Sequence, residues 1–202
     1  MRDLEIRGAG NLLSGDQSGH IAAVGYDLYV QMVSEAVAEL KGEEVRQPAE
    51  IKLDLPVSAN LPASYVGRED LRLEAYRRLA TVTTRAEVED IAAEWTDRYG
   101  PCPPEAEALL RIGHLRAECA RLGIREVTVV TSGSLPSSGF VARLAPLALK
   151  ASERVRLNRL WSKAVYKEEV GQVVLPMPRG SEPAGDLVDF LTSLVPPVVS
   201  GG

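Results

Sequence analysis

The sequence predicts an α+β fold, loosely α/β, in which helices pack against a small sheet of short strands. Apolar residues recur every three to four positions over several segments, a spacing typical of helices with one buried face. Two stretches in the second half of the chain instead alternate between apolar and polar residues, as strands of a half-buried sheet do. Helical and strand segments follow one another without strict alternation, which favours α+β over a regular α/β arrangement.

The N-terminal part of the chain, up to residue 42, is predicted to be a hook followed by a long helix. Asp3 and Arg7 stand four residues apart on a short charged helix, where they can form an ion pair. Four glycines between residues 8 and 19 break this helix and allow tight turns. Apolar residues at helical spacing over residues 28–40 predict a long amphipathic helix that ends in a lysine and a glycine.

A polar stretch with one proline, residues 43–50, is predicted to be a linker to a second unit. That unit, residues 51–195, is expected to be a compact mixed domain, and the tail, residues 196–202, is expected to be disordered. The strands predicted within the domain cover residues 51–55, 126–131, 139–144, 165–167 and 172–175. The predicted helices cover residues 69–81, 84–99, 105–122, 151–160 and 185–194.

Local signals set several of these boundaries. Thr84 and Glu87 are predicted to form a capping box at the start of one helix. In this motif the hydroxyl and the carboxylate each accept a hydrogen bond from a free backbone N–H at the helix start. The pair Pro103–Pro104 before the next helix and Gly123 after it are the expected helix start and stop. The faces expected to be buried are Val88, Ile91, Ala92, Trp95 and Tyr99 on one helix, and Ala108, Ile112, Leu115, Cys119 and Leu122 on the next.

Composition excludes several classes of function. The net charge of −5 argues against broad nonspecific binding of nucleic acid, so any contact with DNA is expected to be local. No apolar run approaches the roughly 18 residues of a membrane span, and Met1 begins no signal peptide. Two cysteines, Cys102 and Cys119, are too few for a disulfide framework or a zinc site. We therefore expect a protein of a reducing cytoplasm, with no membrane partner.

Common catalytic motifs are absent from the sequence. It has no G-x-x-x-x-G-K-[ST] phosphate loop, so we do not expect it to bind and hydrolyse ATP in that manner. No serine lies in a G-x-S-x-G elbow, and neither His20 nor His114 has the spacing of a metal ligand or of a nucleophile's base. His114 is expected on a helix surface and Cys119 in the core. We therefore predict no catalytic, metal or cofactor site in this chain.

The most distinctive motif lies at the N-terminus. The string RDLEIRGAGNLL, followed by GDQSGH, closely resembles the translocation motif shared by the RecG and Mfd families of bacterial DNA translocases. The next residues, IAAVGYDLYVQMVSEAVAELKG, resemble the continuation in the Mfd family, the transcription-repair coupling factors. Gly15 and Asp16 replace an acidic pair common in that family. The resemblance implies that the motif acts through Arg2, Asp3, Glu5, Arg7 and Gln17.

In the resembling family, this motif transmits the action of upstream helicase motor domains, which use ATP and magnesium, into movement along double-stranded DNA. The whole protein recognises RNA polymerase stalled at DNA damage, displaces it and recruits excision repair. The resemblance therefore implies that residues 1–42 couple to a motor and that residues 51–195 form the C-terminal regulatory domain.

A second resemblance concerns the helix that carries Trp95. The string EWTDRYG is similar to the segment by which the C-terminal domain of these factors docks on their N-terminal, UvrB-like module. That docking covers the surface that recruits UvrA. The resemblance implies that Glu94, Asp97 and Arg98 contact this module. From the residues alone, the same face is equally compatible with a solvated helix carrying one ion pair between Glu94 and Arg98.

Two hypotheses follow from the sequence. The chain is either an accessory region of a DNA translocase or a stand-alone protein-interaction module without motor function. Three arginines, Arg154, Arg156 and Arg159, also leave open whether one helix carries a DNA-binding patch or only a solvated face.

Overall fold

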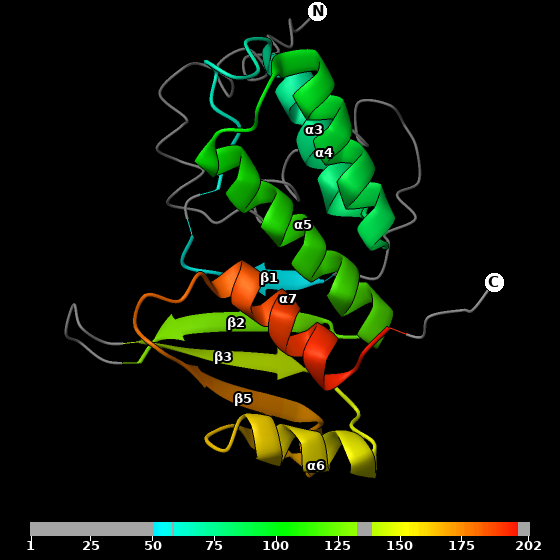
Figure 1. Cartoon of the computed structure of the whole chain (residues 1–202), viewed down its shortest axis with the longest axis vertical. Helices are drawn as coiled ribbons and strands as arrows, with labels where there is room; N and C mark the ends of the chain where they lie inside the picture. The colour runs from blue at the N-terminus through cyan, green and yellow to red at the C-terminus, as the bar shows by residue number, and fades with distance from the viewer. Residues whose placement is uncertain (1–50, 58, 133–138, 198–202) are drawn as a thin grey trace, which may run out of the picture.

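The computed structural model describes residues 51–57, 59–132 and 139–197, which form a five-stranded sheet with helices packed on it (Figure 1). This architecture confirms the predicted α+β fold. The predicted hook and helix of residues 1–42, the linker of residues 43–50 and the tail beyond residue 197 lie outside the described residues.

The sheet has the strand order β1-β2-β3-β5-β4 and is antiparallel except for one pair. Its strands are β1 (Lys52–Asp54), β2 (Glu126–Thr131), β3 (Phe140–Ala145), β4 (Val165–Lys167) and β5 (Gln172–Met177). Strand β1 runs parallel to β2, and the chain between them forms three helices. Strands β2 and β3 pair antiparallel along their whole length, with Glu126 opposite Ala145 and Thr131 opposite Phe140. The predicted hairpin is therefore confirmed.

Strand β5 extends past its predicted end. It pairs with β3 as far as Met177 opposite Phe140, although Pro176 lacks the N–H that a central strand needs. Strand β4 covers β5 only between Gln172 and Val174. Pro176 therefore lies where β4 leaves one side of β5 uncovered, and a proline is tolerated there.

The described residues contain five α-helices and one short 3-10 helix. They are α3 (Glu69–Thr81), α4 (Arg85–Tyr99), α5 (Pro104–Leu122), α6 (Ala151–Leu160), η2 (Glu168–Val170) and α7 (Pro183–Leu194). Figure 1 shows α3 and α4 side by side at one end of the molecule, with α5 running from them towards the sheet. Helix α7 lies over the sheet beside α5, and α6 lies at the opposite end, next to β5. None of these helices has the length and apolar character needed to cross a membrane.

Helix α4 begins at the predicted capping box. The Thr84 hydroxyl oxygen accepts a hydrogen bond from the Glu87 backbone N–H at 3.3 Å, and the Glu87 carboxylate accepts one from the Thr84 backbone N–H at 3.1 Å. The same carboxylate accepts a hydrogen bond from the Thr83 N–H at 2.7 Å. These N–H donors, Thr83 first, hold the pKa of Glu87 below its usual value. The helix ends at Gly100, whose positive φ of 86° suits a glycine.

Helix α5 is buried on more of its circumference than the sequence predicted. Its buried residues are the expected Ile112, Leu115 and Cys119, and also Ala106, Leu109, Leu110, Gly113, Ala117 and Glu118. Ala108 and Leu122, which were expected in the core, are only partly buried. The reason is that α5 packs against α3 and α4 as well as against α7, so it has no single buried face.

Polar contacts attach both ends of α7 to α5. At the start of α7, the Glu182 carboxylate accepts a hydrogen bond from the Gly185 N–H at 2.7 Å and pairs with Arg111 of α5 at 3.2 Å. At its end, Arg121 of α5 donates to the Val195 carbonyl at 2.8 Å. The two helices therefore form one layer over the sheet.

The predicted core face of α4 is confirmed at its centre. Val88, Ile91 and Trp95 are buried, and Trp95 is only 2% exposed. Ala92 and Tyr99, predicted on the same face, are partly buried against this core. Trp95 therefore packs in the core. Its two neighbours in the sequence, Glu94 and Thr96, lie at the surface.

Replacing Trp95 by alanine is expected to destabilise the domain by about 3–5 kcal/mol, because the substitution removes a buried indole and leaves a cavity. Chemical denaturation of the purified chain measures this change. Asp90→Ala, an exposed position on the same helix, is the matched control and is expected to change stability by about 0.5 kcal/mol or less. Equal effects of the two substitutions would contradict the assignment of the buried face.

Candidate functional site

The sequence-predicted site residues fall into two groups. The five motif residues, Arg2, Asp3, Glu5, Arg7 and Gln17, lie outside the described residues. The other three lie in the second half of α4: Glu94 is half-buried, whereas Asp97 and Arg98 are exposed.

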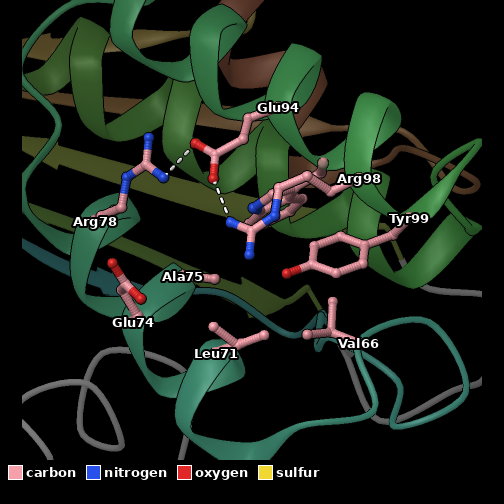
Figure 2. Close-up of a pocket in the computed structure, with 9 residues that line it drawn as sticks. Val66, Leu71, Glu74, Ala75, Arg78, Glu94, Arg98 and Tyr99 are labelled. Carbon is pink, nitrogen blue, oxygen red and sulfur yellow. Dashed lines mark hydrogen bonds and ion pairs between the residues drawn. The ribbon is translucent and has the colours of Figure 1, made fainter.

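The carboxylate of Glu94 bridges two arginines (Figure 2). Its Oε1 accepts a hydrogen bond from Arg98 Nη1 at 2.8 Å, one helical turn further along α4. Its Oε2 accepts one from Arg78 Nη1 of α3 at 2.5 Å. Sequence spacing predicted the Arg98 pair but missed Arg78, because the contact joins two helices and spans 16 positions in the chain. No local pattern marks a partner at such a separation.

In this cluster, Arg78, Glu94 and Arg98, hydrogen bonds to the two guanidinium groups favour the ionised form of the Glu94 carboxyl. The guanidinium of Arg78, followed by that of Arg98, lowers the pKa of Glu94. Glu94 in turn raises the pKa of Arg98, whose guanidinium also lies 5.2 Å from the centre of the Tyr99 ring. The side chains of Arg78, Glu94 and Arg98 are 41%, 32% and 46% exposed, so solvent screens both ion pairs and they contribute little to stability.

Two hollows adjoin the charged cluster. The first lies between α3 and α4 and holds about 20 Å³, enough for one water molecule. It is lined by Val66, Leu71, Glu74, Ala75, Arg78, Glu94, Trp95, Arg98 and Tyr99. The second holds about 240 Å³, and it shares Arg78 with the first. Neither hollow is lined by Asp97. The cluster is therefore a surface feature and not the wall of a ligand cavity.

The loop before α3 supports the end of α4 that carries this cluster. The Tyr65 hydroxyl donates to the Gly100 carbonyl at 2.8 Å, and its ring meets Tyr99 edge to face with ring centres 5.7 Å apart. Burial raises the pKa of the Tyr65 hydroxyl, which therefore stays protonated as a donor. These contacts fix Tyr99 beside Arg98.

The described cysteines and histidine lie in or beside the packed interior. Cys119 is fully buried, as predicted, and Cys102 lies with its sulfur 3.3 Å from the Tyr65 hydroxyl. Within the described ranges, no three metal-ligating side chains come together. His114 is half-buried rather than on the surface, because α5 is covered on several sides. Its Nδ1 atom is enclosed and has no hydrogen-bond partner, and burial lowers the pKa of the ring.

Two of the three arginines on α6 have structural partners. Arg154 pairs with Glu168 of η2 at 2.6 Å, and Arg156 donates to the Leu194 carbonyl at the end of α7 at 2.7 Å. Arg159 is exposed. These contacts attach α6 to the rest of the domain, which favours the structural interpretation of this helix over a DNA-binding patch.

Fold and surface together define a small α+β domain whose charged cluster lies on two adjacent helices. The TRCF domain family model matches residues 55–135. The chain is 42% identical over 190 residues to the transcription-repair-coupling factors of Mycobacterium bovis and Mycobacterium tuberculosis, covering 89% of this chain and 15% of each relative. The factor of Myxococcus xanthus is 40% identical over 142 residues, which cover 70% of this chain and 12% of that protein.

A solved structure shows the same fold. The crystal structure of a C-terminal domain of transcription-repair coupling factor aligns with a TM-score of 0.57 and 20% identity, covering 75% of this chain and 95% of that one. The chain belongs to the transcription-repair coupling factor family, and its resemblance to the C-terminal region is confirmed. It spans about 15% of the length of the first curated relatives that it matches.

The buried His114 predicts a pH dependence of stability. The pKa of His114 in the folded protein lies below the value of about 6.5 expected in the unfolded chain. At a pH between these two pKa values, His114 is protonated mainly in the unfolded chain, which is thereby favoured. Stability contributed by neutral His114 is therefore lost as the pH falls from above 6.5 towards the folded pKa. Nearby Arg85 lowers this pKa further, whereas Glu89 and Glu118 oppose the shift.

Thermal melts of the wild type and His114→Gln between about pH 7.5 and pH 5 test this dependence. Glutamine does not titrate, so the melting temperature of the variant is expected to fall less on acidification. Parallel curves for the two proteins would show that His114 takes up its proton equally in the folded and unfolded states.

Proposed function

We propose that this chain is the C-terminal part of an ATP-dependent DNA translocase that couples transcription to nucleotide excision repair. Membership of the transcription-repair coupling factor family supports this proposal. In it, residues 1–42 transmit the movement of upstream helicase motor domains on double-stranded DNA. ATP and magnesium belong to that motor, which acts on RNA polymerase stalled at DNA damage.

Residues 51–195 restrain the recruitment of UvrA by docking on the N-terminal, UvrB-like module. The observation that carries this proposal is the charged cluster on α3 and α4, Arg78, Glu94 and Arg98, with exposed Asp97 beside it on α4. Half-exposed charged groups give a contact its specificity while each remains weak, which suits an interaction that must release. Of the two adjoining hollows, one holds about 20 Å³ and the other about 240 Å³, both below the roughly 300–1,000 Å³ of ligand pockets, which favours a protein partner over a small molecule.

A stand-alone interaction module is the alternative. The described residues contain a continuous hydrophobic core, so the docking surface is supported by packing within the domain itself. The two proposals share this surface and differ in whether residues 1–42 act together with a motor.

Charge reversal on α4 is expected to weaken docking and spare the fold. Asp97→Arg is the cleaner substitution, because Asp97 is exposed and no ion pair involves it within the described part of the chain. Arg98→Glu additionally breaks the pair with Glu94. We expect each variant to bind the separated N-terminal module about tenfold more weakly, equivalent to about 1.4 kcal/mol.

In the full-length protein, the same substitutions are expected to raise the affinity for UvrA, measured by titration. Glu89→Arg is the matched control, since Glu89 lies on another side of α4, where it pairs with Arg85. Unchanged UvrA affinity in folded Asp97→Arg and Arg98→Glu proteins would reduce this face to solvated surface.

Arg7 and Gln17 are expected to couple ATP hydrolysis to movement. Full-length proteins with Arg7→Ala or Gln17→Ala should still hydrolyse ATP but fail to displace a stalled RNA polymerase. The measurement is the rate of polymerase release alongside the rate of ATP hydrolysis. Normal release by either variant would remove that residue from the coupling role and favour the interaction-module alternative.

A further inference from the structure

We propose that Arg78 of α3 is a positioning residue of the docking surface, which it extends from α4 onto α3 by fixing the Glu94 carboxylate. The proposal rests on the docking function proposed above. It concerns a residue that lies outside the EWTDRYG segment and on a different helix.

The first argument is the geometry of the cluster. Arg78 and Arg98 each occupy a different oxygen of Glu94, so the carboxylate is held from two helices at once. Glu94 cannot change rotamer without losing one of these charge-assisted bonds. Figure 2 shows the Glu94 carboxylate lying between the two guanidinium groups, with Tyr99 next to Arg98. Arg78 therefore sets the position of Glu94, and through Glu94 that of Arg98.

The second argument excludes a simpler role for Arg78. An arginine in the last turn of a helix often serves only to satisfy that helix's final carbonyl groups. In α3 the Thr81 hydroxyl lies 3.0 Å from the Arg78 carbonyl and 3.3 Å from the Arg77 carbonyl, to which it can donate. The guanidinium of Arg78 instead reaches across to α4.

The third argument concerns what the cluster presents to a partner. Both oxygens of Glu94 already accept hydrogen bonds, whereas the Arg98 guanidinium that Glu94 holds retains further N–H donors on a side chain that is 46% exposed. Arg78 also lines both hollows, so it lies at the centre of the two-helix surface. A partner seated on α4 at Arg98 therefore meets an arrangement that depends on α3.

A double-mutant cycle tests this positioning role. Four versions of the 202-residue chain are compared, namely wild type, Arg78→Met, Glu94→Ala and the double variant, by titration with the separately expressed N-terminal module. We expect each single substitution to weaken binding by about five- to tenfold, and the double variant to bind no more weakly than Glu94→Ala alone. Arg78→Lys, which keeps a cation but not the planar fork, is expected to restore part of the loss.

Arg85→Met is the matched control, because it removes an arginine that pairs with Glu89 elsewhere on α4. It should leave binding unchanged. Melting temperatures of all variants are expected to stay close to that of the wild type, since the Arg78 pair is half-exposed.

Two results overturn the proposal. Wild-type affinity of Arg78→Met for the N-terminal module would show that Arg78 plays no part in docking. A loss of affinity in the double variant equal to the product of the two single losses would show that Arg78 does not act through Glu94. Failure of the docking function itself gives a different pattern, in which Asp97→Arg and Glu94→Ala also leave binding unchanged. If Arg78→Met is unfolded, the comparison of Arg78→Lys with Glu94→Ala decides: full wild-type affinity in the former overturns the positioning role.

Discussion

The close approach of α5 to α3 and α4 is the contact on which the rest of this domain depends. A Cβ atom at Gly113 would lie 2.9 Å from Leu79 of α3 and 3.3 Å from Val88 of α4, and both of those side chains are fully buried. A larger residue at position 113 would force the Leu79 and Val88 side chains to shift, and a packed core has little space to absorb that movement. Helix α5 also contacts α7, which lies over the sheet, so a shift of α5 would reach both halves of the fold.

This packing also determines the charged surface. Leu79 lies next to Arg78 in the sequence, and Val88 lies on the buried face of α4 opposite Glu94. The contact of Leu79 and Val88 with Gly113 therefore fixes the distance between the two helices that the ion pair of Arg78 and Glu94 spans. A bond of this kind tolerates little displacement, since hydrogen bonds weaken steeply once distance and angle depart from their optimum. The core thus sets the geometry of the surface, although the surface adds little to the stability of the core.

Elements with local signals could be predicted from the sequence, and features made by contacts between distant segments could not. The capping box of Thr84 and Glu87 placed the start of α4 because both partners lie within one turn. Periodicity placed α3 and α6 with the boundaries that the structure has. The second buried side of α5, the parallel pairing of β1 with β2 and the ion pair of Arg78 with Glu94 all escaped prediction. Each of these features depends on where a second, distant element lies in space, and a local sequence pattern does not give that position.

The buried core and the charged surface therefore use different residues of the same helices. On α4, Trp95 packs in the core, whereas the adjacent Glu94 holds two arginines at the surface. On α6, by contrast, Arg154 and Arg156 bond to neighbouring elements, so these arginines attach the helix to the rest of the domain. The number of charges on a helix does not distinguish these cases. The hydrogen-bond partners of the guanidinium groups do. Those of α6 bond η2 and the end of α7, while Arg78 and Arg98 meet at one half-exposed carboxylate between two helices. The latter arrangement holds arginines of two helices on one carboxylate, so its charged groups are both fixed in position and accessible to a partner protein.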